Sequence, residues 1–344
     1  KKWAVICEHI IRHYNYGWAD GFKLNMPYWE IWNEPDLDSD DSQNKRTWGG
    51  TRAQFFDLFE IAAKHLKGCF PGIKIGGPAR VLLFPETEEQ ITALVQCARA
   101  NGVRLLTIGN GSNLLVADKG IDAAVLVMDK HFSAVTVKGD TIFAQAGASL
   151  MKVCRTALEH SLTGLEFAYG IPGSCGGAAF MNAGAYGGEM KDVLVRCTHI
   201  DGDGKSGQLA GEDLHLSYRH SAYYDNGCII TGLELRLQPG DPAEIKAKMD
   251  DLIGRRREKQ PIEYPSAGST FKRPPGHFAG ALIDQCGLRG TSVGGARVSE
   301  KHAGFVINTG GATCADVLAL CRQCREKVLA ETGVELEMEI RVTE

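Results

Sequence analysis

Residues 80 to 128 read RVLLFPETEEQITALVQCARANGVRLLTIGNGSNLLVADKGIDAAVLVM, in which apolar segments alternate with polar or glycine-rich ones. The pattern predicts a strand, a helix, a second strand, a glycine loop and a third strand. Acidic residues from Glu86 to Glu89 stand where the helix should begin, and the positive end of the helix dipole favours carboxylates there. This unit predicts a mixed α and β fold for the chain that follows.

The glycine loop in this stretch consists of Gly109, Asn110, Gly111, Ser112 and Asn113. Backbone N–H groups in so tight a turn can converge on an anion such as a pyrophosphate. The pattern differs from the dinucleotide fingerprint, in which a helix follows the glycines directly. An anion site and an ordinary structural turn both fit these five residues.

A second glycine cluster, YGIPGSCGGAAFMNAGAYGGE, occupies residues 169 to 189. Backbone that carries no side chains can lie directly against a flat ligand. A compact structural loop would have the same composition. Because two separate loops offer the same chemistry, we favour the ligand site.

Three polar residues further along the chain are candidates for chemistry. Arg219 stands in the aromatic stretch LSYRHSAYY, which predicts a half-buried strand, and Glu339 stands in the alternating stretch GVELEMEIRVTE, which predicts another. Ser269 lies between Gly268 and Thr270. Taken singly, the three could be a structural ion-pair partner, a solvated strand residue and a turn hydroxyl.

The N-terminal segment is of a different kind. MPYWEIWNEPD, residues 26 to 36, is an apolar strand that ends at Asn33 and Glu34. An amphipathic helix is predicted after it, over 51–67, and a second strand begins at IKIGGPA, residues 73 to 79. Strands that end in polar loops are typical of parallel α/β barrels.

This segment resembles clan A glycoside hydrolases, nearest to the β-xylosidase and α-iduronidase family. The resemblance implies that Glu34 is a general acid/base and that Asn33 holds the sugar 2-hydroxyl. A retaining glycosidase also needs a second carboxylate about 5 Å away, and nothing after residue 79 offers one. We therefore expect residues 1–78 to be a partial (β/α) barrel fragment, a vestigial glycosidase without its nucleophile.

From about residue 76 to 344 the chain resembles the UDP-N-acetylenolpyruvoylglucosamine reductase family, in its shorter type II branch. The resemblance implies an FAD-binding domain of the vanillyl-alcohol-oxidase (PCMH) type over 79–240, N-terminally truncated, and an α/β substrate-binding domain over 241–344. It rests on GNGSNLLV (109–116), GIPGSCGGAAFMNAGAYGGE (170–189), YRHSAYY (218–224), KQPIEYPSAGSTFKRPPGHFAGALI (259–283), VGGARVSEKHAGFVIN (293–308) and ELEMEIR (335–341).

The resemblance also implies the reaction, an NADPH-consuming, FAD-dependent reduction of UDP-N-acetylglucosamine enolpyruvate to UDP-N-acetylmuramate in peptidoglycan precursor synthesis. Arg219 would face the developing charge on the substrate, Ser269 would protonate C2 and Glu339 would stabilise the enol-like intermediate. Lys259 and Tyr218 would contact the substrate. The residues implied to hold FAD are Gly109, Asn110, Gly111, Ser112, Asn113, Gly170, Ile171, Pro172, Gly173, Ser174, Gly176, Gly177, Asn182, Gly184 and Ala185.

The composition restricts the remaining possibilities. The chain has 344 residues and a net charge of -4, without the basic excess of a nucleic-acid-binding protein. No apolar run reaches the roughly 18 residues that a membrane span needs. The eleven cysteines are scattered, which favours reduced, buried thiols in the cytoplasm. Cys321 and Cys324 form a CRQC pair without a partner pair, so we expect buried thiols rather than a zinc site.

The join between the two segments lies in KIGGPA, residues 74 to 79, a word that fits both resemblances. No flexible spacer separates the halves, as would be usual between tethered domains. We expect a monomer that acts on a small UDP-sugar. A glycoside hydrolase and an inactive chimera remain the alternatives.

Overall fold

The structure is a computed structural model that describes residues 2–16 and 79–344. The chain forms two compact units, Lys1–Pro78 and Ala79–Glu344. In the first unit the structure describes one helix, α1 (Lys2–Tyr16). The predicted strand that ends at Asn33 and Glu34, the helix after it and the strand from residue 73 lie outside the described residues.

The second unit begins with three parallel strands, as residues 80–128 predict. β1 (Ala79–Leu83) and β2 (Leu105–Ile108) both pair with β4 (Ile121–Val127), so β4 lies between them. α3 (Glu88–Ala100) connects β1 to β2. Thr87 caps this helix, because its hydroxyl accepts a hydrogen bond from Gln90 N at 3.3 Å.

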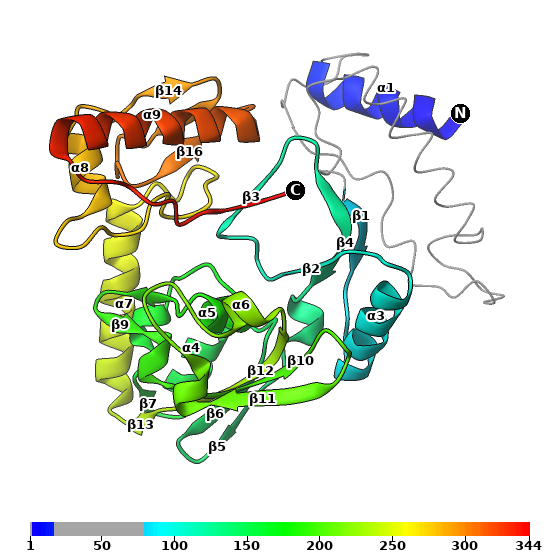
Figure 1. The fold of residues 1–344 in the computed structure, drawn as a ribbon. Helices are drawn as coiled ribbons and strands as arrows, with labels where there is room; N and C mark the ends of the chain where they lie inside the picture. Colours follow the sequence, from blue (N-terminus) through cyan, green and yellow to red (C-terminus); the bar gives the residue numbers. More distant parts are fainter. Residues whose placement is uncertain (1, 17–78) are drawn as a thin grey trace. The chain divides into compact units, whose positions relative to one another are not determined.

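A second, antiparallel sheet of five strands carries the larger core, in the order β11-β10-β12-β6-β5. Helices α4, α5 and α6 lie over one face of it (Figure 1). The strands and helices are β5 (Val135–Lys138), β6 (Thr141–Gln145), β10 (Leu194–Ile200), β11 (Ser206–Ala210), β12 (Ile229–Arg236), α4 (Leu150–Glu159), α5 (Cys175–Phe180) and α6 (Tyr223–Asn226).

Short elements join these pieces. They are the 3-10 helices η1 (Lys130–Phe132), η2 (Glu166–Ala168), η3 (Met190–Asp192) and η4 (Gly211–Leu214), and the strand pairs β7 (Leu162–Thr163) with β13 (Gln238–Pro239) and β8 (Gly184–Ala185) with β9 (Gly188–Glu189).

The long helix α7 (Pro242–Lys259) leads from this core to the C-terminal region (Figure 1). Asp241 caps it, since the Asp241 carboxylate accepts a hydrogen bond from Ala243 N at 2.8 Å. Ile245 and Met249 on this helix still pack into the larger core. The domain boundary expected at residue 240 stays a prediction.

The C-terminal region has its own, smaller core. Three antiparallel strands pack against two helices and are ordered β14-β15-β16. The elements are α8 (Ala279–Gln285), β14 (Ser292–Val293), β15 (Ala296–Val298), β16 (Val306–Asn308) and α9 (Cys314–Thr332). Thr313 and Asp316 form a capping box at the start of α9, which satisfies two backbone N–H groups there.

The last strand returns to the beginning of the unit. β17 (Arg341–Thr343) pairs in parallel with β3 (Leu114–Val116), the strand directly after the first glycine loop. Leu115 on β3 packs against the smaller core. The pairing therefore joins the N-terminal glycine loop to the C-terminal core, although the two are far apart in sequence.

Cys321 and Cys324 lie on α9 in this smaller core, and each is at most 1% exposed. Burial raises the pKa of Cys321 to about 12 and that of Cys324 to about 11, which keeps both thiols protonated. Their position confirms the interpretation as buried apolar side chains. Within residues 2–16 and 79–344, no cluster of three or more His, Cys, Asp or Glu side chains could hold a metal ion.

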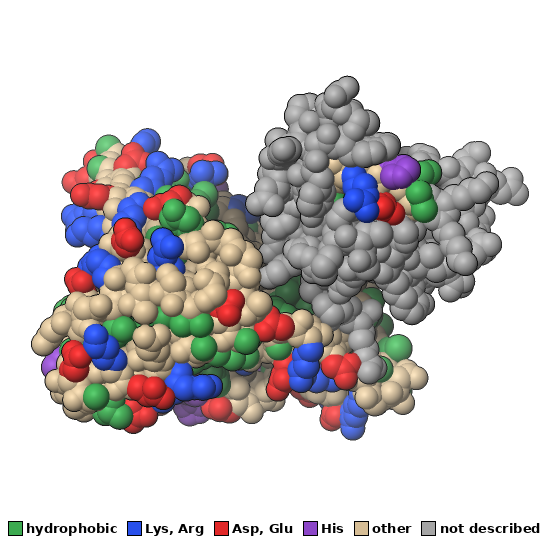
Figure 2. Space-filling view, turned by 90° about the horizontal axis from the view of Figure 1, so that it is seen from above, with side chains coloured by type: hydrophobic (Ala, Val, Ile, Leu, Met, Phe, Trp, Pro, Cys, Tyr) green, Lys and Arg blue, Asp and Glu red, His purple; other side chains and the backbone are tan. Residues whose placement is uncertain are grey.

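The surface of the second unit is mixed in charge. On the face seen in Figure 2, Lys and Arg side chains are interspersed with Asp and Glu. Among the described residues, no helix combines the length and apolar character that crossing a bilayer requires.

Glu166 on η2 is a carboxylate in the larger core, with its side chain 2% exposed. Burial alone would raise its pKa, but hydrogen bonds from Thr163 and the Gly164 amide, together with the charge of Lys248, lower it overall. Because the folded-state pKa lies below the unfolded one, the ionised form stabilises the fold above the unfolded pKa. That stability is lost as pH falls through the folded pKa.

We therefore predict that Glu166→Gln lowers the free energy of unfolding near neutral pH by about 1–3 kcal/mol, because buried donors lose a charged acceptor. Urea unfolding followed by circular dichroism tests this, with the exposed Glu159→Gln as control. Wild type should lose stability relative to the variant as pH falls below the ordinary glutamate value of 4.5. The same pH dependence in both proteins would contradict the assignment.

Candidate active site

One cavity of about 650 Å³ brings both glycine clusters together within the second unit. Its walls come from the loop after β2, the segment before and within α5, the residues around Ser269, and the segment before β17. Arg219 and Glu339 also line it. Segments more than two hundred residues apart in sequence thus meet at one site.

The first glycine loop presents backbone donors to this cavity. The N–H groups of Asn110, Gly111, Ser112 and Asn113 donate to no acceptor in the described part of the chain. Gly111 has a φ of +65°, a conformation that glycine adopts without strain. Consecutive free N–H groups in a tight turn can converge on an anion, which is one of the two interpretations that the sequence pattern allows.

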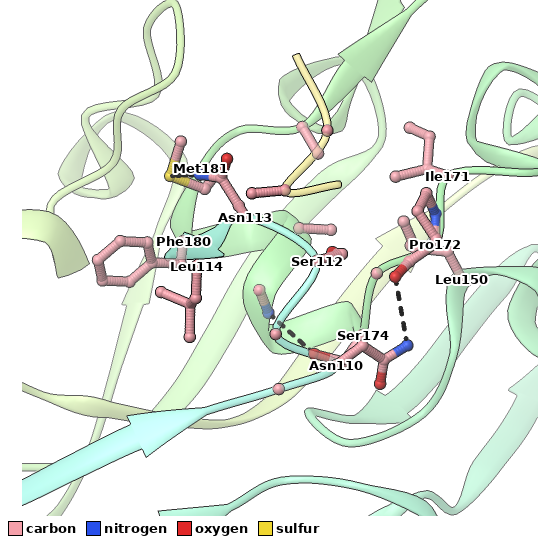
Figure 3. Close-up of a pocket in the computed structure, with 18 of the residues that line it drawn as sticks. Asn110, Ser112, Asn113, Leu114, Leu150, Ile171, Pro172, Ser174, Phe180 and Met181 are labelled. Atoms are coloured by element: carbon pink, nitrogen blue, oxygen red, sulfur yellow. Dashed lines mark hydrogen bonds between the residues drawn. The ribbon is translucent and has the colours of Figure 1, made fainter. Parts of the chain in front are cut away.

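Side chains of this loop tie it to its neighbours. Asn110 Nδ2 donates to Pro172 O at 3.4 Å, across to the second glycine cluster (Figure 3). Asn113 Nδ2 donates to Glu339 O at 3.2 Å and lies beside the sulfur of Met181 (Figure 3). The loop therefore has a fixed position relative to the other two walls.

The second cluster approaches the first so closely that side chains are excluded. A Cβ atom on Gly109 would overlap the hydroxyl of Ser174, and one on Gly176 would lie 2.8 Å from the Cβ of Ala146. Ser174 caps α5, with its hydroxyl accepting a hydrogen bond from Gly177 N at 3.3 Å (Figure 3). Glycine is therefore needed at 109 because of the Ser174 side chain and at 176 because of Ala146.

Gly177 is different, since it faces open space. A Cβ on Gly177 would meet only Ser174 Oγ, at 3.4 Å. Around this opening Leu114, Leu150, Ile171 and Phe180 supply apolar side chains (Figure 3). Free amide donors beside an apolar wall match a ligand with a charged linker and a flat ring system, such as FAD.

Arg219 and Glu339 form an ion pair on the cavity wall. Arg219 Nε donates to Glu339 Oε1 at 2.7 Å, and the two side chains are 19% and 11% exposed. Burial raises the pKa of Glu339, and the nearby Arg219 charge opposes this rise without cancelling it. The pair thus combines a cation with a carboxyl group that holds a proton more readily than usual.

The predicted strand around Arg219 is wrong. Arg219 lies in a turn between Ser217 and His220, which pair with each other, and its φ is +56°. A residue with that φ does not continue a regular strand. The aromatic residues around Arg219 gave no indication of a turn in the sequence. The strand predicted around Glu339 is also wrong at that residue, because β17 begins only at Arg341; the Glu339 N–H instead donates to Thr270 O at 2.9 Å.

Ser269 lies directly before Thr270, whose carbonyl accepts this hydrogen bond. It lines the cavity and is half-buried. Among the described residues, no hydrogen bond involves the Ser269 hydroxyl. The pairing of Phe271 with Met338 holds Ser269 and Glu339 on neighbouring chain segments. A free hydroxyl therefore adjoins the ion pair.

Four other expected site residues do not line the cavity. Asn182 is fully buried and its amide is hydrogen-bonded within the protein. Ala185 lies on β8, beyond the cavity lining. Tyr218 is 49% exposed, and its hydroxyl accepts a hydrogen bond from Arg273 N at 3.0 Å. Lys259 ends α7 and is exposed.

Two arginines line the cavity that the sequence did not single out. Arg341 lies against the rings of both Phe180 and Tyr224, with its guanidinium carbon 4.7 and 4.9 Å from their centroids. Arg256 donates from Nη1 to Gly170 O at 2.8 Å. Arg256 belongs to a run of three arginines that resembles any solvated helix end, so sequence alone gives it no special role.

Comparison with known proteins agrees with this geometry. Residues 79–208 match the model of the FAD binding domain, and residues 260–343 match the C-terminal domain of UDP-N-acetylenolpyruvoylglucosamine reductase. The Clostridium novyi reductase of that name is 46% identical over 286 residues, which cover 83% of this chain and 93% of the relative. The chain belongs to the UDP-N-acetylenolpyruvoylglucosamine reductase family.

Other members of the reductase family support the same assignment. The Geobacillus kaustophilus enzyme is 48% identical over 272 residues, covering 78% of this chain and 88% of that protein. The crystal structure of the Thermus caldophilus enzyme superposes with a TM-score of 0.66 at 36% identity, covering 76% of this chain and 92% of that chain. The chain is thus an FAD-dependent oxidoreductase by family, with FAD and NADPH as cofactors, and the expected fold class is confirmed.

The N-terminal resemblance is also found. Residues 1–132 match the model of glycosyl hydrolases family 39, and this match overlaps the start of the FAD-binding match. The expected recognition of two unlike families in one chain is therefore confirmed. Glu34 and Asn33 lie outside the described residues.

We predict that Gly177→Val abolishes stoichiometric FAD binding, because a β-branched side chain would project into the cavity where backbone meets the ligand. The flavin absorbance of the purified protein measures this. Gly254→Val is the matched control, since Gly254 lies on α7 with nothing within 4 Å of its Cβ position. Full flavin content in Gly177→Val would contradict the assignment of the second glycine cluster to FAD binding.

Proposed function

We propose that this chain catalyses the NADPH-dependent reduction of UDP-N-acetylglucosamine enolpyruvate to UDP-N-acetylmuramate. The observation that carries the proposal is the Arg219–Glu339 ion pair, which shares one cavity with both glycine clusters and with Ser269. A glycine cradle alone would fit many flavoproteins. A cation, a carboxyl group and a free hydroxyl beside it fit a hydride addition that is completed by a proton.

FAD, held by the two glycine clusters, would supply the hydride chemistry that links oxidation of NADPH to hydride addition at C3 of the enolpyruvyl group. Negative charge then develops on C2 and its carboxylate. Arg219 uses Nε on Glu339, while its Nη1 and Nη2 have no acceptor in the described part of the chain. Those two groups form a planar fork suited to the substrate carboxylate, and they stabilise the developing charge.

Ser269 is proposed as the proton donor to C2. A serine hydroxyl is a weak acid, so charge stabilisation by its neighbours has to assist it. Glu339 supports this role, because it accepts a hydrogen bond from Arg219 Nε at 2.7 Å and so holds the guanidinium beside the site of the enol-like intermediate. Arg219 and Glu339 thereby act on the substrate carboxylate while Ser269 acts on the carbon.

The proposed FAD contacts are those expected residues that line the cavity, which omits Asn182 and Ala185. The first loop, Asn110 to Asn113, would hold the pyrophosphate through its free N–H groups. Arg341 and Arg256 add positive charge to the same cavity. Lys259 and Tyr218 remain proposed contacts of the UDP part of the substrate, outside the cavity.

We also propose cytoplasmic location and a monomeric state, with an FAD domain over 79–240 and a substrate domain over 241–344. The separate smaller core of the C-terminal region supports the second domain. Activity of the chain in its present form, behind the glycosidase-like segment, belongs to the proposal as well.

Glycoside hydrolysis is the competing function, and we predict that it is absent. Glu34 would be the acid/base, but the chain offers no candidate for the nucleophile that a retaining enzyme needs. Release of nitrophenol from aryl xylosides measures this. Turnover that disappears in Glu34→Gln would overturn the prediction.

The decisive prediction for the reductase concerns Ser269→Ala. Reduction of the flavin by NADPH should stay close to the wild-type rate, since it requires no proton at C2. Reoxidation by the enolpyruvyl substrate should slow by about 10²–10⁴-fold, the usual worth of a positioned acid. Rapid-mixing absorbance at the flavin band follows each half-reaction separately.

Arg219→Lys provides the comparison within the same experiment. It should also slow the second half-reaction alone, because a point charge replaces a planar fork. If Ser269 were only a turn residue after Gly268, its loss would slow both half-reactions together or neither. Equal slowing of the two steps in Ser269→Ala would rule out the proton-donor role.

A further inference from the structure

Arg219 has a backbone conformation that residues with side chains rarely adopt. Its φ is +56°, in a turn whose ends, Ser217 and His220, exchange both backbone hydrogen bonds at 3.1 and 3.2 Å. In this left-handed region the Cβ atom crowds the following carbonyl, so the conformation persists only where surrounding contacts maintain it. The contacts on either side of the turn therefore decide where the guanidinium lies.

On the C-terminal side the contact is made by Ser221. Its hydroxyl donates to Phe180 O at 2.8 Å, and the residue is fully buried. Phe180 is the last residue of α5, the helix that lines the cavity at Gly176 and Gly177. One end of the turn is thus attached to the end of the glycine-rich helix.

On the N-terminal side the contact is made by Asn182, also fully buried. Asn182 Nδ2 donates to Ser217 O at 2.9 Å and to Glu189 Oε2 at 2.7 Å. Asn182 Oδ1 accepts a hydrogen bond from Lys191 N at 2.9 Å. The partners at Glu189 and Lys191 fix the orientation of the amide, so that one N–H must point at Ser217.

We infer that Asn182 and Ser221 are positioning residues, which together hold the Arg219 turn on the C-terminal end of α5 so that the guanidinium faces the cavity. Asn182 therefore acts through Arg219 rather than by touching FAD. The inference rests on the proposed role of Arg219 in the second half-reaction.

The hydrogen bonds from Asn182 to Ser217 and from Ser221 to Phe180 explain how a strained turn can hold the Arg219 guanidinium in a defined position. Without either of them the turn can relax to an ordinary negative φ, which swings the Arg219 side chain away from its place beside Glu339. The substrate carboxylate would then lose its contact with Arg219, while the two glycine clusters keep their conformation. Loss of either hydrogen bond should slow reoxidation of the flavin by the substrate and leave the rate of flavin reduction by NADPH unchanged.

A double-mutant cycle tests this on the FAD-loaded full chain. Ser221→Ala should slow reoxidation by the enolpyruvyl substrate about five- to tenfold, the usual effect of one lost hydrogen bond, and leave flavin reduction unchanged. In an Arg219→Ala background the same change should have no further effect on reoxidation. An equal effect in both backgrounds would mean that Ser221 acts elsewhere, and would overturn the inference.

Two further variants separate positioning from general stability. Ser221→Thr keeps the hydroxyl and should restore most of the reoxidation rate. Thr231→Val removes another buried hydroxyl, which contacts Thr198 at 2.9 Å and lies outside the cavity lining. It should leave both half-reactions unchanged. Slowing by Thr231→Val equal to that by Ser221→Ala would contradict a specific role.

Hydrogen exchange gives a readout that does not depend on the reaction. Asn182→Ala and Ser221→Ala should each speed amide exchange in the peptide 217–221 by about fivefold or more, because the turn opens more often. Unchanged amide exchange in both variants would overturn the proposed positioning role of Asn182 and Ser221. If wild type failed to reoxidise with the enolpyruvyl substrate, the proposed function would fall while the exchange result would still decide the positioning role.

Discussion

The parallel pairing of β17 with β3 is the constraint on which the site depends. It aligns Arg341 with Leu114, and the Asn113 amide hydrogen-bonds to Glu339 O one step earlier. Without this pairing Glu339 would be separated from the first glycine loop and from Arg219, which hydrogen bonds hold at the end of α5. A few backbone hydrogen bonds between β17 and β3 thus place the two glycine clusters and Glu339 around one cavity.

Close backbone packing and buried charge work together in this cavity. Glycine at 109 leaves room for the Ser174 hydroxyl and glycine at 176 leaves room for Ala146, where a Cβ would collide. Burial raises the pKa of Glu339, and the charge of Arg219 opposes this rise without cancelling it.

Much of this architecture could be predicted from the sequence, because local patterns carry it. The β1-α3-β2 order follows from apolar periodicity, and the glycine loops from composition. The turn at Arg219 could not be predicted, because it is held by groups distant in sequence, Asn182 and the Phe180 carbonyl. The roles of Arg341 and Arg256 were missed for the same reason, since only the folded chain brings them to the cavity. Asn182 was assigned to FAD by resemblance, whereas its hydrogen bonds are within the protein.

The distance in sequence between the joined strands sets the order in which the site can assemble. Asn113 and Glu339 are 226 positions apart, so the larger core can form around its antiparallel sheet long before β17 reaches β3. During that interval the cavity lacks the wall that carries Glu339 and Arg341. Capture of the flavin at full affinity must then follow docking of the C-terminal region, and the bound cofactor favours the docked state by mass action. FAD binding at full affinity therefore depends on the pairing of β3, near the beginning of the second unit, with β17 at its end.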